Sequence, residues 1–261
     1  MNILIIGDVF SKLGRKILEN NINKIKEEKH INFVIINGEN ISHGKGINEG
    51  HYKWLMTHGA NVVTLGNHTY QNKSILNIME NTNNLVRPCN YPESSPGTGY
   101  CTMNYNGIKI TVFQVIGELF MKNPENTTSF FKATEELLGK VKSDIYICDF
   151  HGEATSEKVA YGLYNDGKIQ VIYGTHTHVP TNDLRILPKG TAYISDVGMT
   201  GPLNAVIGVK AQIIFDRMIK EKTHFFDPED EGEAQLNGIV VEINEKTYKV
   251  EKVEQIQIFE K

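Results

Sequence analysis

Short apolar runs rich in Ile and Val recur along the chain, and each one ends in Gly, Asp, Asn or His. Hydrophobicity within each run is continuous rather than alternating, which is typical of strands buried on both faces of a sheet. Segments with the apolar spacing of helices lie between the runs. The predicted strands are 3–6, 33–36, 62–65, 145–148 and 171–173, and the predicted helices are 14–28, 48–59, 128–142 and 155–164. This alternation predicts an α/β fold with a mainly parallel sheet.

Two stretches depart from this alternation and predict inserted β-hairpins. Residues 98–116 hold two alternating runs on either side of Asn106-Gly107, a strong hairpin turn signal. Near the C-terminus, the apolar stretches 238–243 and 248–259 are joined by the polar residues NEKT. We therefore expect antiparallel strands in addition to the parallel ones.

The segment 199–236 has the least regular pattern. It contains a Gly/Pro turn, the apolar helical stretch AQIIFDRMIK and the acidic run DPEDEGE. We interpret the acidic run as a solvated loop rather than a binding tail. Because no linker, repeat or low-complexity tract divides the chain, we expect a single domain over 1–261 in which 199–236 forms a cap or a loop insertion.

The composition is that of an ordinary globular protein, with 40% hydrophobic residues among 261. A net charge of −4 excludes a general basic field for nucleic acid or anionic membranes, so phosphate chemistry would need local positive charge. The three widely spaced cysteines form no C-x-x-C, which argues against a disulfide framework or a zinc finger. No run approaches the roughly 18 apolar residues of a membrane span, and the N-terminus lacks the basic region of a signal peptide. We expect a soluble, cytoplasmic protein.

Polar residues that bind metals or move protons follow every predicted strand. Ligands of open α/β sheets bind outside the carboxyl ends of the strands, so these side chains would meet at one edge. They are Asp8, Glu39, Asn40, Asn67, His68, His151, His176 and His178. Each has an ordinary structural explanation when taken alone, as a helix cap, a loop or turn polar residue, or a core histidine with a partner. Their recurrence after five strands favours a functional site.

The residue types narrow the chemistry of that site. Three imidazoles with carboxylates and amide oxygens suit Mn, Fe or Zn better than Mg or Ca. The ligands are too many for one tetrahedral ion, so we expect two ions roughly 3.5–4 Å apart with Glu39 as the bridge. Two divalent ions bound by the carboxylates of Asp8 and Glu39 would leave a net charge of about +2, which would attract a phosphoryl group. Water between the ions, with its pKa lowered towards ~7, would be the nucleophile, and His68 would protonate the leaving oxygen.

The motifs resemble those of the calcineurin-like metallophosphoesterases. That family's signature is D-x-H, G-D-x-x-D-R, G-N-H-[ED], a lone His and G-H-x-H, and the counterparts here are GDVF, NGEN, GNHT, FHGE and GTHTH, from residue 7 to residue 178. The chain departs from the signature in two places: Phe10 replaces the first histidine, and Glu39 followed by Asn40 replaces the second-strand aspartate. With ENISHGKGI and SDVGMTGP, these departures resemble the YmdB-like bacterial phosphodiesterases that act on cyclic nucleotides.

The resemblance implies a four-layer α/β/β/α core with mixed sheets, Fe or Mn as metals, and a homo-oligomer. It also implies roles for the site residues. Asp8 and His178 would bind one metal, and Asn40 would supply the ligand that Phe10 cannot. The other metal would be bound by Asn67, His151 and His176. Glu39 would bridge the two metals, and His68 would be the acid or a phosphate contact. His43 and Lys45 in SHGKG and Thr200 in GMTGP are weaker candidates for substrate contacts. His176 and His178 lie two apart, so in an extended strand end they would share a side, roughly 6–7 Å apart, one for each metal.

Three functions remain open. The leading hypothesis is a dinuclear-metal phosphodiesterase that hydrolyses 2′,3′- or 3′,5′-cyclic nucleotides, or related phosphodiesters, through a metal-bridging hydroxide. The alternatives are a phosphomonoesterase or nucleotidase on the same scaffold, and a metal-dependent regulatory protein that senses nucleotides or RNA with little turnover. The absence of the D-R arginine argues against monoester dianions. No P-loop or dinucleotide-binding glycine motif is present.

Overall fold

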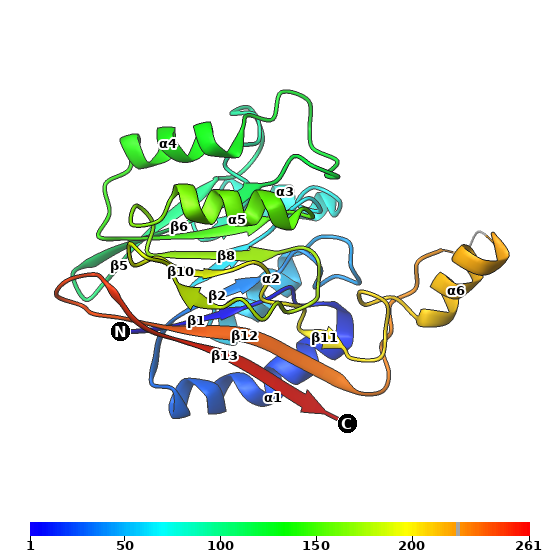
Figure 1. The fold of residues 1–261 in the computed structure, drawn as a ribbon. Helices are drawn as coiled ribbons and strands as arrows, with labels where there is room; N and C mark the ends of the chain where they lie inside the picture. Colours follow the sequence, from blue (N-terminus) through cyan, green and yellow to red (C-terminus); the bar gives the residue numbers. More distant parts are fainter. Residues whose placement is uncertain (223–224) are drawn as a thin grey trace.

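The computed structural model describes residues 1–222 and 225–261 (Figure 1). Its elements, in chain order, are β1 (Asn2–Ile6), α1 (Ser11–Glu28), β2 (Ile31–Asn37), α2 (Glu49–Thr57), β3 (Val62–Thr64), the 3₁₀ helix η1 (Lys73–Ile75), α3 (Leu76–Met79), β4 (Leu85–Val86), β5 (Tyr100–Tyr105), β6 (Ile108–Ile116), α4 (Phe130–Lys140), β7 (Ile145–His151), α5 (Thr155–Tyr164), β8 (Val171–Thr175), β9 (Arg185–Ile186), β10 (Ala192–Ile194), β11 (Gly201–Pro202), α6 (Ala211–Lys220), β12 (Ala234–Ile243) and β13 (Val250–Glu260).

The strands form two mixed sheets. The first has the order β11-β12-β1-β2-β3-β4, with β13 paired to β12, and the second has the order β5-β6-β7-β8-β10-β9. Strands β1 to β4 run parallel, as do β6, β7, β8 and β10, whereas β12, β5 and β9 pair antiparallel with their neighbours. The predicted α/β fold with mixed sheets is confirmed.

Three apolar cores separate four layers. In β1, Ile3 and Ile5 face the second sheet, while Leu4 and Ile6 face α1 and α2. A third core lies between the second sheet and helices α4 and α5, which cover its outer face (Figure 1). Because successive residues of a strand point to opposite faces, a strand between two cores must be apolar throughout. This explains the continuous runs and agrees with the predicted α/β/β/α layering.

The inserted hairpins form where the sequence places them. Asn106 and Gly107 connect β5 to β6, and both have positive φ, at 50° and 90°. This is the backbone that a two-residue hairpin turn requires. Strands β12 and β13 pair over their length and form the second hairpin. Strands β4, β9, β10 and β11, each of two or three residues, were not predicted.

The segment 199–236 contains β11, α6 and the start of β12, and the description omits 223–224 within it. Helix α6 has no buried residue and projects away from the two sheets (Figure 1). Most of the acidic run is solvated as predicted. Asp230 is an exception, because it accepts hydrogen bonds from Ser11 Oγ at 2.7 Å and from the Lys12 N–H at 3.2 Å. The acidic run therefore attaches the projecting part of segment 199–236, called the arm below, to the start of α1.

Within the described part of the chain, no helix has the length and apolar character to cross a membrane. The three cysteines are all unpaired.

Candidate metal centre

The eight residues predicted from the strand ends meet at one place. Asp8 follows β1, Glu39 and Asn40 follow β2, and His151 is the last residue of β7. Since β1 and β2 belong to the first sheet and β7 and β8 to the second, the site lies where the carboxyl ends of both sheets meet. The remaining members, from the ends of β3 and β8, are Asn67, His68, His176 and His178.

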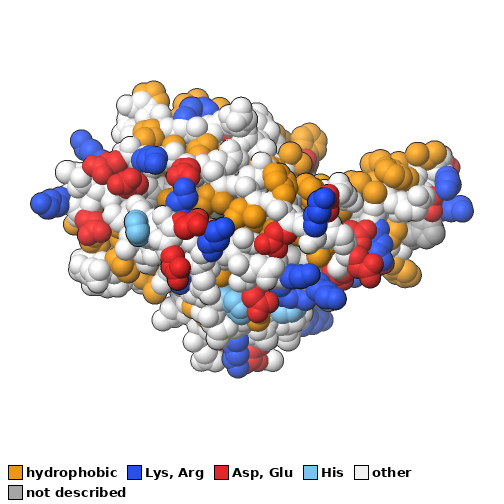
Figure 2. Space-filling view, turned by 90° about the horizontal axis from the view of Figure 1, so that it is seen from below, with side chains coloured by type: hydrophobic (Ala, Val, Ile, Leu, Met, Phe, Trp, Pro, Cys, Tyr) orange, Lys and Arg blue, Asp and Glu red, His pale blue; other side chains and the backbone are white. Residues whose placement is uncertain are grey.

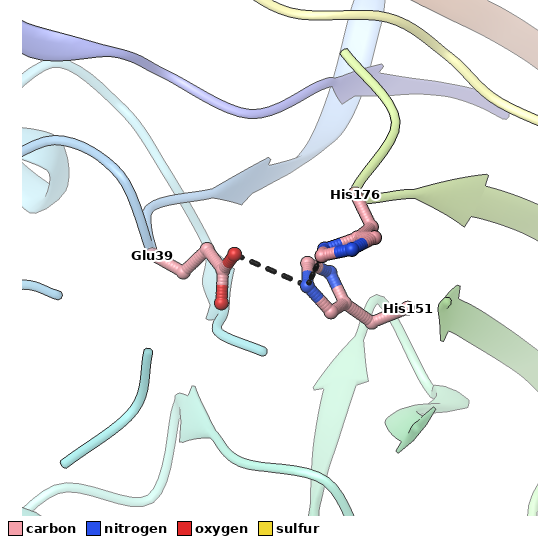
Figure 3. Close-up of side chains that lie close together, drawn as sticks. All are labelled: Glu39, His151 and His176. Atoms are coloured by element: carbon pink, nitrogen blue, oxygen red, sulfur yellow. Dashed lines mark hydrogen bonds and ion pairs between the residues drawn. The ribbon is translucent and has the colours of Figure 1, made fainter. Parts of the chain in front are cut away.

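One end of the site contains Glu39, His151 and His176. One ligand atom from each lies within 4.8 Å of the others, as expected for residues that hold one metal ion (Figure 3). His151 Nε2 lies 3.1 Å from Glu39 Oε1, 3.2 Å from His176 Nδ1 and 2.9 Å from Asn67 Oδ1. Three nitrogen and oxygen donors converge with an amide oxygen beside them, a donor set suited to Mn, Fe or Zn.

The other end contains Asp8, Asn40 and His178. Asn40 Nδ2 lies 3.2 Å from Asp8 Oδ1, 3.3 Å from Glu39 Oε1 and 3.2 Å from His178 Nε2. Its Oδ1 faces His68 Nδ1 at 3.1 Å. The Asn40 amide therefore links the two ends, and a half-turn of the amide would direct its oxygen to the same three groups.

Gly66 keeps space open beside these ligands. A Cβ at this position would lie 2.1 Å from Glu39 Oε2 and 2.5 Å from His151 Nε2. No other residue type fits there without displacing both side chains. The buried donor set and the space next to it fit a bound transition-metal ion.

The backbone of the GTHTH loop differs from the predicted extended strand end. Strand β8 ends at Thr175, and His176 and His178 have positive φ of 98° and 68°. The two histidines nevertheless reach different ends of the site, because His176 contacts His151 whereas His178 contacts Asn40. The separation comes from a left-handed loop and not from the strand pleat.

A buried ion pair holds this loop. Asp196 Oδ2 accepts from the Thr177 N–H at 3.1 Å, from Thr177 Oγ1 at 2.8 Å and from Lys158 Nζ at 2.8 Å. Asp196 and Lys158 are both almost completely buried. The positive charge of Lys158 and hydrogen bonds to the carboxylate outweigh burial and lower the pKa of Asp196. Asp196 thus anchors the residue between the two histidines.

Phe10, in place of a histidine, packs beneath the second end. Its ring meets the His178 imidazole edge-on, with centroids 5.8 Å apart. His178 Nδ1 is held by the Ile207 carbonyl at 3.0 Å, which leaves Nε2 directed at Asn40. Phe10 supports the orientation of His178 without offering a ligand atom.

The electrostatics of the site follow from close charges in a buried space. Burial lowers the pKa of His151, but the negative charges of Glu39 and Asp8 outweigh it and raise that pKa to about 9. Burial and the charge of His151 lower the pKa of His176 to about 3, so this imidazole is neutral at pH 7 with a free lone pair. The pKa of Glu39 is lowered, because attraction to His151 exceeds the effect of burial. The pKa of Asp8 is raised by burial.

A cavity of about 520 Å³ opens above these ligands. Part of its lining is polar and includes Glu39, His68, His176 and His178. The apolar part, called the apolar wall below, consists of Phe10, Ile207, Val209, Phe226 and Pro228. His43 and Lys45, predicted as substrate contacts, also line the cavity.

Thr200, the third predicted substrate contact, has a different place. It is completely buried and is not among the residues lining the cavity. Its N–H donates to the Asp8 carbonyl and its carbonyl accepts from the Phe10 N–H, both at 2.8 Å. Thr200 therefore stabilises the loop that carries Asp8, and its buried position does not fit a substrate contact.

Several residues near the ligands escaped sequence reasoning. Glu153 Oε2 lies 3.3 Å from His176 Nε2 at the cavity rim, and Asp149 and Thr175 lie behind His151. The FHGE motif contains Glu153 and follows Asp149 directly, so it carried a signal for both. Lys158 gave no such signal because it does not follow a predicted strand, and Asp196 lies in SDVGMTGP, which entered only as part of the family resemblance.

Comparisons with known proteins agree with this geometry. The family model of the YmdB-like proteins matches residues 4–256. A Bacillus subtilis protein named 2′,3′-cyclic-nucleotide 2′-phosphodiesterase is 44% identical over 99% of this chain and 97% of its own length. A crystal structure described as a novel phosphatase from Mycoplasma pneumoniae superposes with a TM-score of 0.94 at 40% identity, over 99% of this chain and 93% of its own.

A more distant likeness concerns the fold alone. The NAD nucleotidase of Haemophilus influenzae superposes with a TM-score of 0.61 at 13% identity, covering 98% of this chain and 55% of the nucleotidase. The match of the family model over almost the whole chain, together with the close relatives, places it in a known group. The chain belongs to the family of YmdB-like proteins.

Proposed function

We propose that the protein is a dinuclear-metal phosphodiesterase that hydrolyses cyclic nucleotides, with 2′,3′-cyclic nucleotides as the first candidates. The observation that carries the proposal is the pair of ligand groups linked by Asn40 at the floor of one cavity. The name of the Bacillus subtilis relative supports the cyclic-nucleotide substrate.

Each end of the site would hold one ion. His151, His176 and Asn67 would bind the first and Asp8, His178 and Asn40 the second, with Glu39 between them. A pair of Mn or Fe ions, or of Zn, would supply a water of lowered pKa and neutralise charge on the phosphate. Glu39 suits the bridging position because it contacts both ends: its Oε1 lies 3.1 Å from His151 Nε2 and 3.3 Å from Asn40 Nδ2.

His68 would donate the proton to the leaving oxygen. Its side chain lines the cavity, and Nδ1 is hydrogen-bonded to Asn40, which fixes the ring and leaves Nε2 for a ligand. A positioned imidazole acting as general acid typically contributes about 10²–10⁴ in rate. The same position allows a contact to the phosphate.

The apolar wall would hold the nucleobase. Phe226 and Pro228 come from the segment 199–236, which we propose acts as a cap over the cavity. A ligand with a phosphate at one end and a flat aromatic ring at the other matches a cavity with one polar and one apolar wall. Lys45 is the one Lys or Arg among the lining residues in the described chain, which favours a diester monoanion over a monoester dianion.

We also propose a homo-oligomer. Met218 and Ile219 on α6 are 80% and 76% exposed, and Figure 2 shows apolar side chains gathered on the projecting arm. Exposed apolar patches mark interaction sites, and we propose that a second copy of this chain covers this one. Light scattering after size-exclusion chromatography measures this directly.

A substrate panel tests the proposed function. The protein loaded with Mn, Fe or Zn is assayed with 2′,3′- and 3′,5′-cyclic nucleotides, with bis-p-nitrophenyl phosphate and with 2′- and 3′-nucleoside monophosphates. We expect faster turnover of diesters than of monoesters, and His68→Ala should lower kcat for diesters by about 10²–10⁴.

Faster hydrolysis of monoesters would favour the phosphomonoesterase alternative. Nucleotide or RNA binding without turnover in every metal-loaded form would favour the sensing role.

A further inference from the structure

Asp149 is a buried carboxylate that the proposed chemistry does not use. It lies on β7, two residues before His151, and is completely buried. Thr64 Oγ1 donates to its Oδ2 and Thr175 Oγ1 to its Oδ1, each at 2.6 Å. Gln114 Nε2 and Asn37 Nδ2 donate to Oδ2 at 3.0 and 3.1 Å. Four donors from both sheets hold one carboxylate directly behind the metal site.

The direction of these hydrogen bonds determines the protonation pattern of His151. An ionised carboxylate only accepts, so the single hydroxyl proton of Thr175 points to Asp149. The Thr175 oxygen lies 2.8 Å from His151 Nδ1 and is left to accept there. His151 must therefore carry a proton on Nδ1.

The opposite nitrogen of the ring faces the ligands. His151 Nε2 lies 3.1 Å from Glu39 Oε1 and 3.2 Å from His176 Nδ1. An imidazole binds a metal through an unprotonated nitrogen, and the hydrogen bond made by the other nitrogen selects which one is free. The chain Asp149–Thr175–His151 favours Nε2 as that nitrogen.

We propose that Asp149, acting through Thr175, is a positioning residue that keeps the proton of His151 on Nδ1 and presents Nε2 to the metal. This inference rests on the proposed metal site. It assigns the Thr175 hydroxyl a task that the other donors to Asp149 do not have, since His151 contacts Thr175 and not Thr64.

Thr64 provides a matched control. Thr64 and Thr175 are both completely buried, and each donates to Asp149 at 2.6 Å. Thr175→Val and Thr64→Val remove the same hydroxyl from the same carboxylate with nearly the same change of shape. Only Thr175→Val breaks the link to His151. Thr175→Ser restores the hydroxyl.

The first measurement is Mn²⁺ affinity at pH 7.5 by calorimetry, with the unfolding midpoint of each variant recorded alongside. We expect Thr175→Val to weaken binding by roughly 10- to 100-fold, the cost typical of losing an outer partner of a ligating histidine. Thr64→Val should change it less than about 3-fold, and Thr175→Ser should restore it. Equal weakening by the two valine variants, or none in Thr175→Val, would overturn the inference while leaving the metal site intact.

The second measurement does not depend on the metal. A long-range ¹H–¹⁵N spectrum of the metal-free protein, recorded above the raised pKa of His151 of about 9 so that the ring is neutral, should show Nδ1 of His151 protonated in the wild type and in Thr64→Val. The resonance should shift or broaden in Thr175→Val. An unprotonated Nδ1 in the wild type would refute the inference. A wild-type protein that binds neither Mn, Fe nor Zn would instead refute the proposed function, and the inference with it.

Discussion

The floor of the cavity and its apolar wall are built in opposite ways. We use floor for the ligand cluster at the base of the cavity, whose members Asp8, Glu39 and His151 are at most 1% exposed and come from strand ends of two sheets. On the arm that carries part of the wall, Phe226 is 54% exposed and Met218 is 80% exposed. Buried polar groups are costly unless they are hydrogen-bonded, and each of these groups has a partner within the cluster.

This difference separates the two tasks of the site. Metal binding requires several ligand atoms held in one geometry, which the strand ends supply through the backbone of both sheets. Contact with a nucleobase requires an apolar surface but little directional precision. We therefore expect substitutions on the floor to abolish metal binding or folding and substitutions on the wall to change mainly the affinity for substrate.

The largest effect is expected for Glu39→Gln. The carboxylate is replaced by a neutral amide next to His151, which removes the proposed bridge and one negative charge. Metal affinity should fall by more than the roughly 10- to 100-fold that loss of an outer partner costs. Elemental analysis after dialysis and the rate of diester hydrolysis measure the loss.

Glu153→Gln is the matched control for this change. It alters a half-exposed carboxylate that contacts His176 at the cavity rim. Its effect on metal content should be less than about 10-fold. Equal losses in both variants would contradict the division between a fixed floor and its solvated rim.

The second effect concerns the support of the GTHTH loop. Lys158→Met leaves Asp196 buried without its cation, and such a change typically costs about 3–5 kcal/mol. Urea denaturation should show this loss, whereas Lys132→Met on the exposed face of α4 should change stability by less than about 0.5 kcal/mol.

The acid dependence of stability provides an independent check on this pair. The folded-state pKa of Asp196 is lowered, so its stabilisation is complete above the unfolded value of about 3.9 and is lost as the pH falls through the lower folded value. In Lys158→Met the folded pKa should rise, and acid unfolding should begin at a higher pH. An unchanged acid transition would show that Lys158 does not hold this carboxylate ionised.

The smallest effect is expected on the wall. Phe226→Ala removes an aromatic face that we propose stacks on the base, and stacking of this kind is worth about 1–3 kcal/mol. The KM for cyclic nucleotides should rise by roughly 10-fold with little change in kcat. Phe225→Ala, which alters a neighbour that is 96% exposed and outside the cavity lining, is the control.

A base-free substrate distinguishes stacking from a general disturbance of the cap. Ribose 2′,3′-cyclic phosphate should have the same KM with wild type and Phe226→Ala. A parallel rise for this substrate would mean that Phe226 shapes the cavity without contacting the base.

The sequence indicated the ligands better than the loops that orient them. Asp8, Glu39 and His151 could be predicted because each lies at the carboxyl end of an apolar run, although these runs fall in two sheets and not in the one sheet that the alternation predicted. The extended backbone expected for His176 and His178 was wrong, since both have positive φ. Their conformation depends on Asp196, which is 18 residues further along the chain from His178 and whose contact with Thr177 no local pattern predicts.

Thr200 illustrates the reverse case. Its place in a Gly/Pro-rich loop suggested a substrate contact, yet its backbone pairs with the Asp8 and Phe10 loop and its side chain is buried. Long-range pairing of this kind leaves no periodic trace in the sequence. The same reason accounts for the short strands that were not predicted.

By itself, the sequence determined the α/β fold and the set of polar side chains at the strand ends, because hydrophobic period and strand-end position are local properties that follow from backbone geometry. Only the tertiary structure decided which groups meet Nδ1 of His151 and of His178, which part of the cavity lining is apolar and what holds the GTHTH loop. Those features depend on contacts such as Thr175 to Asp149 and Lys158 to Asp196, which form only when both sheets and their helices have packed together.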